Sequence, residues 1–513
     1  MLTSAPRLNV LFVAIACTLG LAGCSVAETV AANTTPSTPV APTAATVRVA
    51  DCALAALPAI PLNALDVRAF GAVPDDGKDD TAAIQAALDA LKPDQWLVFP
   101  AGRYEHKASL HVRVPGAVMW GEGATLHATN PSDQAVMLQA DRASIYKFRL
   151  TAVTGRRLHA PWQSRIAVFE RVDRPAHLLG NVIRGNRIVE GGAVGTSLAN
   201  GSSSAGIFVF RADGFLVAEN EVRRSLSDGI HVTGGSRNGR VLANTVRETG
   251  DDMIAMVSYL GTGDWTSETA DRLAPTFASQ RDLQLVRNVL VAGNDVEGNY
   301  WGRGISVVGG ADITIEGNRI ARTAVGAGVL LAREASYVTW GVNNVVVKNN
   351  RISQIETASP AYVPSGWTQS GFRTGHAGIE LHAFVFDDER ARPALASVLS
   401  VDDILIAGNT VADTAFDGMR IGEGTGVADS MTGKLPDGRR ASRAFTGGSV
   451  GRIGLSALSM MRTGAAGLAI KSRPTANYNV ACEAVTLDGL PISNSACGGA
   501  KPAVTGSAMT CLP

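Results

Sequence analysis

The segment Asp312-Ile313-Thr314-Ile315, followed after two residues by Asn318-Arg319-Ile320, contains the unit that decides the fold. A short apolar run precedes an Asn, then any residue, then a β-branched apolar residue. The Asn of this triplet recurs at positions 186, 220, 244, 294, 318, 350 and 409. The steps between them are 34, 24, 50, 24, 32 and 59 residues, so the basic repeat is near 24 and the longer steps contain inserted loops.

A repeat of this length is typical of stacked coils. One unit cannot bury its apolar face alone, whereas stacked units share a continuous core. Asn adopts positive φ readily, and stacked Asn amides hydrogen-bond from one coil to the next. The repeat therefore predicts an all-β chain folded as a single-stranded parallel β-helix, with two or three short strands per coil. We expect the repeated Asn residues to be structural rather than catalytic.

A different pattern begins at Leu65. A short strand and turn over residues 65–72 precede a turn-rich acidic stretch over residues 74–80. The spacing of Ile84, Leu88 and Leu91 then predicts a helix from Thr81 to Leu91, with Asp80 as its N-cap. A buried strand and a Gly turn follow over residues 95–104. We expect the acidic side chains at 75, 76, 79 and 80 to form turns and caps rather than a metal site.

This order of elements, DVRAFGAVPDDGKDDTAAIQAAL followed by LVFPAGRY, resembles the N-terminal signature of the pectate lyase-like superfamily, in its rhamnogalacturonase/epimerase-like form. The resemblance covers about forty residues. It implies a right-handed β-helix whose first coil is closed by an N-terminal capping helix.

The start of the chain is typical of an export signal. Arg7 precedes an apolar run that ends in Leu21-Ala22-Gly23-Cys24. This motif resembles a bacterial lipobox, which implies cleavage before Cys24 and lipidation of its thiol. We therefore expect a signal peptide over residues 1–24, a flexible linker over 25–50 and the β-helix domain over 51–513. The protein is expected to be lipid-anchored at the outer membrane, cell surface or periplasm, with no other membrane contact.

The mature chain would keep Cys52, Cys482, Cys497 and Cys511. An even number of cysteines in an oxidising compartment predicts up to two disulfides, with three pairings open. Three of these cysteines lie near the C-terminus, so we expect them to hold together a C-terminal cap.

The charge balance limits the class of partner. The chain has 46 Lys and Arg against 46 Asp and Glu, whereas a protein that binds a polyanion shows a basic excess. Nucleic acid is therefore not expected as a partner. Neutral and uronic polysaccharides remain open, and the sequence does not indicate an oligomeric state.

Two acidic segments are the main candidates for chemistry: Ser227-Asp228-Gly229-Ile230-His231 and Gly250-Asp251-Asp252-Met253-Ile254, with Ser258 beyond. Their Asp residues lie 23 positions apart, close to one coil. We therefore expect Asp228 and Asp251 to stack on neighbouring coils with Asp252 beside them. Clustered carboxylates repel one another, and a fold does not need them, whereas acid and base catalysis does.

These segments, with Gly302-Arg303-Gly304-Ile305-Ser306, resemble the first three motifs of polygalacturonase-type glycoside hydrolases. The resemblance implies inversion, with Asp251 as general acid and Asp228 and Asp252 holding the attacking water. The side chains expected to bind substrate are those of His231, Ser258, Trp301, Arg303 and Arg333.

Three positions depart from that family. Leu226 and Ser227 stand where it has Asn and Thr, and Arg303 replaces its motif His. A guanidinium does not shuttle protons near neutral pH, although it binds carboxylates well. The segment that ends at Arg333 lacks the family's Arg-x-Lys pattern. Galacturonan is therefore doubtful as the substrate.

Two other functions stay open. No cofactor or metal is expected for a hydrolase, but a polysaccharide lyase on this fold would use its carboxylates to hold calcium, and a uronate epimerase is a related option. The third class is a surface glycan-binding protein without catalysis, in which the Asp residues form turns. The loops over residues 261–281 and 357–378 contain aromatic and basic residues suited to sugar binding.

Overall fold

The structure is a computed structural model of the chain. It describes residues 53–153, 155–170, 176–189, 202–260, 283–337, 339–357, 374–386, 398–422, 430–434, 440–471, 478–492, 497–499 and 504. The predicted signal peptide and linker, with Cys24, lie outside these residues, as do Cys52 and Cys511. None of the helices in this part of the chain has the length and apolar character needed to cross a membrane.

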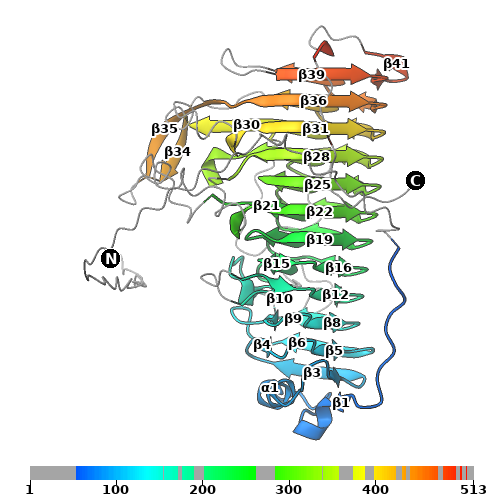
Figure 1. The fold of residues 1–513 in the computed structure, drawn as a ribbon, viewed down its shortest axis with the longest axis vertical. Helices are drawn as coiled ribbons and strands as arrows, with labels where there is room; N and C mark the ends of the chain where they lie inside the picture. Colours follow the sequence, from blue (N-terminus) through cyan, green and yellow to red (C-terminus); the bar gives the residue numbers. More distant parts are fainter. Residues whose placement is uncertain are drawn as a thin grey trace, which may run out of the picture. The chain divides into compact units, whose positions relative to one another are not determined.

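The chain winds into coils that stack along one axis and form three long sheets (Figure 1). Each complete coil passes through the first, the second and then the third sheet, and neighbouring coils pair in parallel, as β18, β21 and β24 do. This confirms the predicted all-β right-handed parallel β-helix.

The first sheet contains β1 (Leu65–Asp66), β2 (Trp96–Val98), β5 (Val118–Trp120), β8 (Ser144–Tyr146), β11 (Leu178–Leu179), β12 (Val182–Arg184), β15 (Ala212–Asp213), β16 (Leu216–Ala218), β19 (Arg237–Leu242), β22 (Arg287–Ala292), β25 (Gly310–Glu316), β28 (Val342–Lys348), β31 (Val401–Ala407), β36 (Val450–Ser456) and β39 (Tyr478–Glu483). The second sheet contains β3 (Gly102–His106), β6 (Ala124–Ala128), β9 (Arg149–Ala152), β13 (Arg187–Ile188), β17 (Glu221–Arg223), β20 (Thr245–Thr249), β23 (Asp295–Asn299), β26 (Arg319–Ala321), β29 (Arg351–Ile355), β32 (Thr410–Thr414), β37 (Ser459–Thr463), β40 (Thr486–Leu487) and β41 (Leu490–Pro491). The third sheet contains β4 (Leu110–Val112), β7 (Val136–Leu138), β10 (Ile166–Val168), β14 (Ile207–Phe210), β18 (Ile230–Thr233), β21 (Ile254–Val257), β24 (Ile305–Val308), β27 (Val329–Arg333), β30 (Ile379–Phe386), β33 (Met419–Gly422), β34 (Ser430–Lys434), β35 (Arg440–Gly447) and β38 (Leu468–Lys471). The helices are η1 (Val67–Phe70), α1 (Thr81–Asp89), η2 (Pro161–Gln163) and η4 (Ala335–Tyr337).

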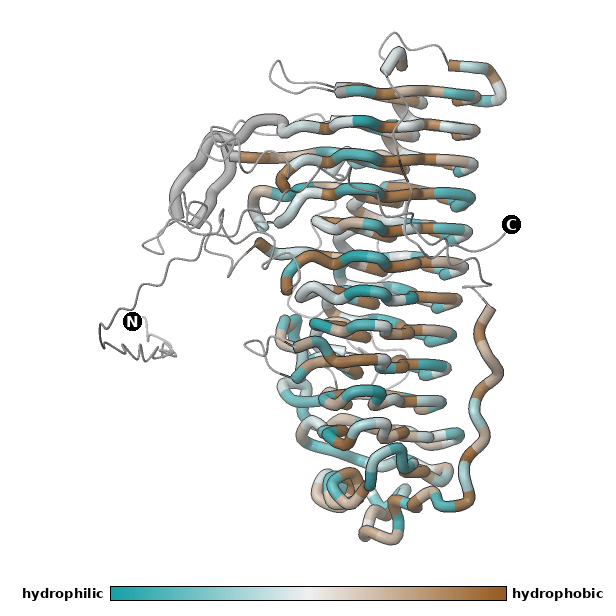
Figure 2. The backbone as a smooth tube through the Cα atoms, in the orientation of Figure 1, coloured by the Kyte–Doolittle hydropathy of each residue, from teal (hydrophilic) through white to brown (hydrophobic). Residues whose placement is uncertain are grey.

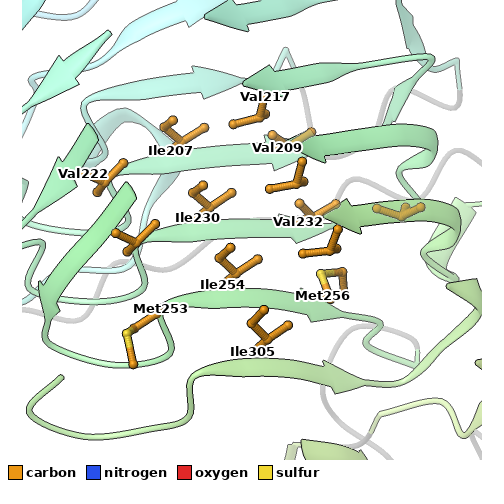
Figure 3. Close-up of a cluster of buried hydrophobic side chains, with 14 of the residues drawn as sticks. Ile207, Val209, Val217, Val222, Ile230, Val232, Met253, Ile254, Met256 and Ile305 are labelled. Atoms are coloured by element: carbon orange, nitrogen blue, oxygen red, sulfur yellow. The ribbon is translucent and has the colours of Figure 1, made fainter. Parts of the chain in front are cut away.

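The core is built from columns of apolar side chains, one residue per coil. Ile207, Ile230, Ile254 and Ile305 lie in register on successive strands of the third sheet, and all four are fully buried (Figure 3). Because side chains alternate along a strand, the residues next to each of these Ile residues in its own strand point outward. Apolar and polar residues accordingly alternate along many coils (Figure 2).

The repeated Asn residues form a buried ladder at the turn between the first and second sheets. The side-chain amide of each donates to the Oδ1 of the next, at 2.9–3.1 Å, from Asn186 through to Asn409. The prediction of a structural Asn stack is confirmed, and the ladder keeps one turn of every coil in line even where loops of different length are inserted.

The two ends of the β-helix are closed differently. Helix α1 spans two residues fewer than predicted, and it buries Ile84 and Leu88 over the first coil. Asp80 occupies the N-cap position, as predicted, although its carboxylate accepts from Val73 N–H and Glu105 N–H rather than from the N–H groups of the helix. At the other end, Cys482 and Cys497 form a disulfide.

Candidate functional site

A groove with a cavity volume of about 660 Å³ runs along the outside of the third sheet. It extends from Phe208 and Phe210 on β14 to His382 and Phe384 on β30, across β18, β21, β24 and β27. Five steps between parallel strands span about 24 Å, so the groove has room for several units of a linear chain.

The acidic side chains lie where strands of the third sheet begin. Asp228 precedes β18 by two residues, and Asp252 and Arg303 hold the same position before β21 and β24. Gly229 N–H donates to Asp252 O at 2.9 Å, and Met253 N–H donates to Arg303 O at 2.9 Å. The three residues therefore form one row across neighbouring coils.

This register corrects the predicted stacking of Asp228 on Asp251. Ile230 pairs with Ile254, a step of 24, so Asp228 is aligned with Asp252 rather than with Asp251. Asp251 N–H instead donates to Ser227 O at 3.1 Å. The 23-residue spacing suggested the wrong pair, because Asp251 lies one residue before the position that is aligned with Asp228. The three carboxylates nevertheless line the same groove.

Gly302 allows two of the carboxylates to meet. Its φ is +82°, and a β-carbon there would lie 2.4 Å from Asp251 Oδ1 and 2.5 Å from Asp252 Oδ1. Any side chain at this position would displace both carboxylates. The Gly-x-Gly motif read from the sequence is thus the feature that lets Asp251 and Asp252 converge.

Asp252 is the most buried of the three carboxylates, with 6% of its side chain exposed. Its Oδ1 accepts from Arg303 N–H and its Oδ2 from the Ser306 hydroxyl, both at 2.6 Å. Burial raises the pKa of Asp252 to about 7, although the Arg303 guanidinium opposes the rise. This carboxylate therefore exchanges its proton near neutral pH.

Asp251 is more accessible, with 22% of its side chain exposed. Its Oδ2 accepts from Arg157 Nη2, which lies 94 residues earlier in the chain. Burial, followed by the charge of Asp228, raises the pKa of Asp251, and Arg157 opposes that rise. Because Arg157 contacts Oδ2, Oδ1 is the oxygen that points toward Gly302.

Asp228 and His231 form a pair within one coil. Asp228 Oδ2 lies 2.6 Å from His231 Nδ1, and the imidazole stacks on the Phe208 ring with centroids 5.2 Å apart. Both side chains line the groove, so His231 lies beside the carboxylates.

Arg303 links the carboxylate cluster to the next part of the groove. Its Nη1 lies 3.8 Å from Asp252 Oδ1, and its Nη2 donates to Glu334 Oε1. Burial opposes the charge of this guanidinium, but Glu334 and Asp252 outweigh that effect and raise its pKa. Arg303 is therefore a permanent cation in the site.

The structure separates the residues predicted to bind substrate. Trp301, Arg303 and His231 line the groove. Ser258 and Arg333 do not: both are fully buried, and the Ser258 hydroxyl donates to Gly309 O while Arg333 donates to Thr339 O and Phe384 O. By the alternation of side chains both point away from the groove, so the structure does not bring them together with the other residues predicted to bind substrate.

Several groove residues were not found from the sequence. Arg157 and His159 come from a segment between β9 and β10, Tyr259 from the end of β21, and Glu334 and Tyr337 from beyond β27. Strand parity was an available signal for one of them, because Glu334 follows the inward-facing Arg333 and so points outward. Most of the two predicted sugar-binding loops, residues 261–281 and 358–373, lies outside the described residues.

Within the described ranges, no group of three or more His, Cys, Asp or Glu side chains is arranged to hold a metal ion.

Comparisons with known proteins agree with this architecture. Residues 64–155 match the family model described as rhamnogalacturonase A/epimerase, pectate lyase-like, which covers the capping helix and the first coils. No curated protein matches the chain in sequence.

Two solved structures resemble the chain along most of its length. The catalytic unit of a GH87 α-1,3-glucanase from Streptomyces thermodiastaticus strain HF3-3 has a TM-score of 0.51 at 15% identity, over 87% of this chain and 73% of that one. The A-module of the mannuronan C-5 epimerase AlgE6 from Azotobacter vinelandii has a TM-score of 0.51 at 13% identity, over 83% of this chain and all of that one. At such identities the likeness is one of fold, and the fold is the right-handed parallel β-helix; the pectate lyase-like match is confined to residues 64–155.

Proposed function

We propose that the protein is a polysaccharide-acting enzyme that hydrolyses a glycosidic bond with inversion. The observation that supports this most directly is the meeting of Asp228, Asp251 and Asp252 in one elongated groove, with the pKa values of Asp251 and Asp252 raised. Two carboxylates with raised pKa values beside a further carboxylate suit acid and base chemistry at one bond.

The geometry supports the following roles. Asp251, the more exposed of the buried pair, donates its proton to the glycosidic oxygen as the bond to the anomeric carbon breaks. A water attacks that carbon from the opposite face, and its proton passes to the Asp228 and Asp252 pair. Asp252 is poorly placed to protonate the substrate, because both of its oxygens already accept hydrogen bonds.

The rest of the groove suits a sugar chain. The rings of Phe208, Phe210 and Phe384 line its two ends, where they offer apolar faces to sugar rings. Arg157 and Arg303 hold the carboxylates in place and supply positive charge next to them. The two similar structures are also named for reactions on polysaccharides, cleavage of an α-1,3-glucan and epimerisation of mannuronan.

A second candidate is a reaction at C5 of a uronate, either elimination or epimerisation. It is favoured by the two guanidinium groups at the cluster, since Arg157 and Arg303 are suited to binding a substrate carboxylate. Both reactions begin with removal of the C5 proton. Elimination then breaks the bond between C4 and the glycosidic oxygen and leaves a C4=C5 double bond, whereas epimerisation returns a proton to the other face of C5 and breaks no glycosidic bond. They therefore give products that differ from those of hydrolysis.

The test is to incubate the full chain with neutral glucans and polyuronates, and to follow reducing ends together with the absorbance near 235 nm that marks unsaturated products. Reducing ends without absorbance, lost in Asp251→Asn, would support hydrolysis. Absorbance that rises with the reducing ends would replace it with elimination. As a matched control, Asp94→Asn changes an exposed Asp that pairs with Arg142, far from the groove, and should leave turnover unchanged.

A further inference from the structure

A second cluster of polar side chains lies at the far end of the groove. It consists of His376, Glu380 and His382, and we call it the His-Glu-His cluster. Glu380 is in register with Leu330 on β27, and the same row continues through Ser306 on β24 to Ala255 on β21, close to Asp252. Three strand steps separate β30 from β21, so the cluster lies about 14 Å from the carboxylates along the groove.

Glu380 fixes the orientation of both imidazoles. Its Oε2 lies 3.0 Å from His376 Nδ1, and its Oε1 lies 3.0 Å from His382 Nδ1. Burial alone would raise the pKa of Glu380, but the two histidines lower it well below its usual range. An ionised carboxylate only accepts hydrogen bonds, so both Nδ1 atoms must be donors.

With Nδ1 directed at Glu380, Nε2 is the nitrogen of the His382 ring that is left to bind a ligand. His382 is 3% exposed and lines the groove, and its Nε2 is buried without a hydrogen-bond partner among the described residues. An unsatisfied buried polar atom costs about 1–3 kcal/mol, and native structures contain few of them. The position calls for a hydrogen-bonding group that a ligand supplies.

His376 has the complementary property. Burial opposes its charge, but Glu380 outweighs that effect and raises the pKa of His376. A charged His376 presents an Nε2–H donor. The buried Glu356 holds the backbone at this point, because its carboxylate accepts from His376 N–H and Gly375 N–H, both at 3.0 Å.

An aromatic surface adjoins these two groups. The Phe384 ring stacks on His382 with centroids 4.2 Å apart, and both rings line the groove. A hydroxyl donor, a hydroxyl acceptor and an apolar ring face are the three features of a neutral sugar unit. An anion is less well matched, because Arg420 is already engaged by Asp417 and Gly375 O, and Glu380 would repel the ligand.

We propose that His376, His382 and Phe384 form a binding subsite for a neutral sugar unit of the polysaccharide, three strands away from the catalytic carboxylates. A hydroxyl of that unit forms a hydrogen bond with His382 Nε2, and a second oxygen accepts from His376 Nε2. The inference rests on the proposed glycan-acting function, but it concerns binding and is tested without turnover.

The experiment uses the full chain with Asp251→Asn, so that no probe is cleaved, and measures the dissociation constants of neutral gluco-oligosaccharides of increasing length and of oligouronates. Adding His382→Phe keeps a ring beside Phe384 but removes Nε2. It should raise the dissociation constant of long neutral oligosaccharides about tenfold, which corresponds to the free energy of one hydrogen bond. Binding of the shortest ones should be unaffected. His111→Phe, on β4 of the same sheet and outside the groove, is the matched control and should change nothing.

A second measurement does not depend on the variant folding normally. In the Asp251→Asn protein with ¹⁵N-labelled histidine, the Nε2 resonance of His382 should shift when a long neutral oligosaccharide is added. The subsite would be overturned if His382→Phe left the affinity for long neutral oligosaccharides unchanged. An Nε2 resonance of His382 that did not move, or binding of oligouronates alone, would overturn it as well. A subsite that binds neutral sugars in a protein that cleaves none would refute the proposed hydrolysis and leave the subsite standing.

Discussion

At the scale of single residues, the site contains a buried carboxylate at a position where a neutral side chain would make the folded state more stable. Asp252 lies almost wholly inside the protein, between Asp251 and Arg303, and its pKa is raised to about 7. An unfolded chain would ionise it near pH 3.9. Between these values the folded protein binds a proton that the unfolded chain does not, so the free energy of unfolding falls as pH rises through this window.

We therefore expect Asp252→Asn to stabilise the protein and to abolish turnover. The amide preserves an acceptor for Arg303 N–H and avoids the buried charge. The gain in unfolding free energy should be about 2 kcal/mol larger at pH 8 than at pH 5, because the wild-type penalty is not complete until pH passes the raised pKa. Urea unfolding at the two pH values measures it, and an equal gain at both would contradict the buried, proton-binding role.

Arg157 sets the pH at which Asp251 loses its proton. Its guanidinium lowers a pKa that burial and Asp228 raise, so Arg157→Gln should move the alkaline limb of the activity profile upward, by about one pH unit. The profile of kcat/KM against pH measures this shift. Arg142→Gln removes an exposed guanidinium that pairs with Asp94 and should leave the profile in place. A profile unmoved by Arg157→Gln would mean that Asp251 is not the acid.

At the scale of the strands, the alternation of side chains decides which residues reach the groove. Ile254 and Met256 point into the core, so Ser258 does too, whereas Ala255 and Val257 line the outer face. The same alternation applies from Val329, which points into the core. It directs Arg333 away from the groove and Glu334 toward it. The turns before the strands do not follow this alternation, and there the carboxylates depend on glycine.

Gly302→Ala should abolish turnover and destabilise the fold by about 3 kcal/mol, since the added carbon meets two carboxylates at a positive φ. Gly317→Ala is the matched control, because Gly317 also has a positive φ, of +63°, but a β-carbon there meets nothing within 4 Å. It should cost about 1 kcal/mol and preserve turnover. Activity assays and thermal unfolding test the pair, and equal loss of activity in both would show that Gly302 acts only through backbone strain.

At the scale of the whole molecule, the Asn ladder is the continuous element that ties the coils together. Asn294 accepts from the backbone and side chain of Asn244 and donates to Val241 O and to Asn318, each at 2.9 Å. Each coil touches only its neighbours, so a break in this ladder weakens one interface rather than the whole array.

Asn294→Ala should lower the unfolding free energy by about 3 kcal/mol, because it leaves buried donors of Asn244 without acceptors. Asn343→Ala removes an exposed amide that makes one long contact, at 3.5 Å, and should change stability by less than about 0.5 kcal/mol. Urea unfolding compares the two variants. If both cost the same, the ladder contributes no more than any surface Asn.

Much of this protein could be predicted from its sequence, because the relevant interactions are local or periodic. The Asn repeat and the apolar runs recur from coil to coil, so their spacing predicted a parallel β-helix, and the resemblance of the N-terminal segment added its handedness and the capping of its first coil. The three carboxylates and His231 were predicted together because they lie in two short segments whose separation is close to one coil.

Only the tertiary structure decided how those groups work. Inserted loops change the number of residues per coil, so spacing did not reveal that Asp228 aligns with Asp252, that Arg157 reaches Asp251 from 94 residues away, or that Glu380 holds two histidines in the same groove. The pKa of Asp252 depends on burial and on Arg303 across a coil boundary. Desolvation and charge act through space rather than along the chain, and for that reason they follow from the packed coils alone.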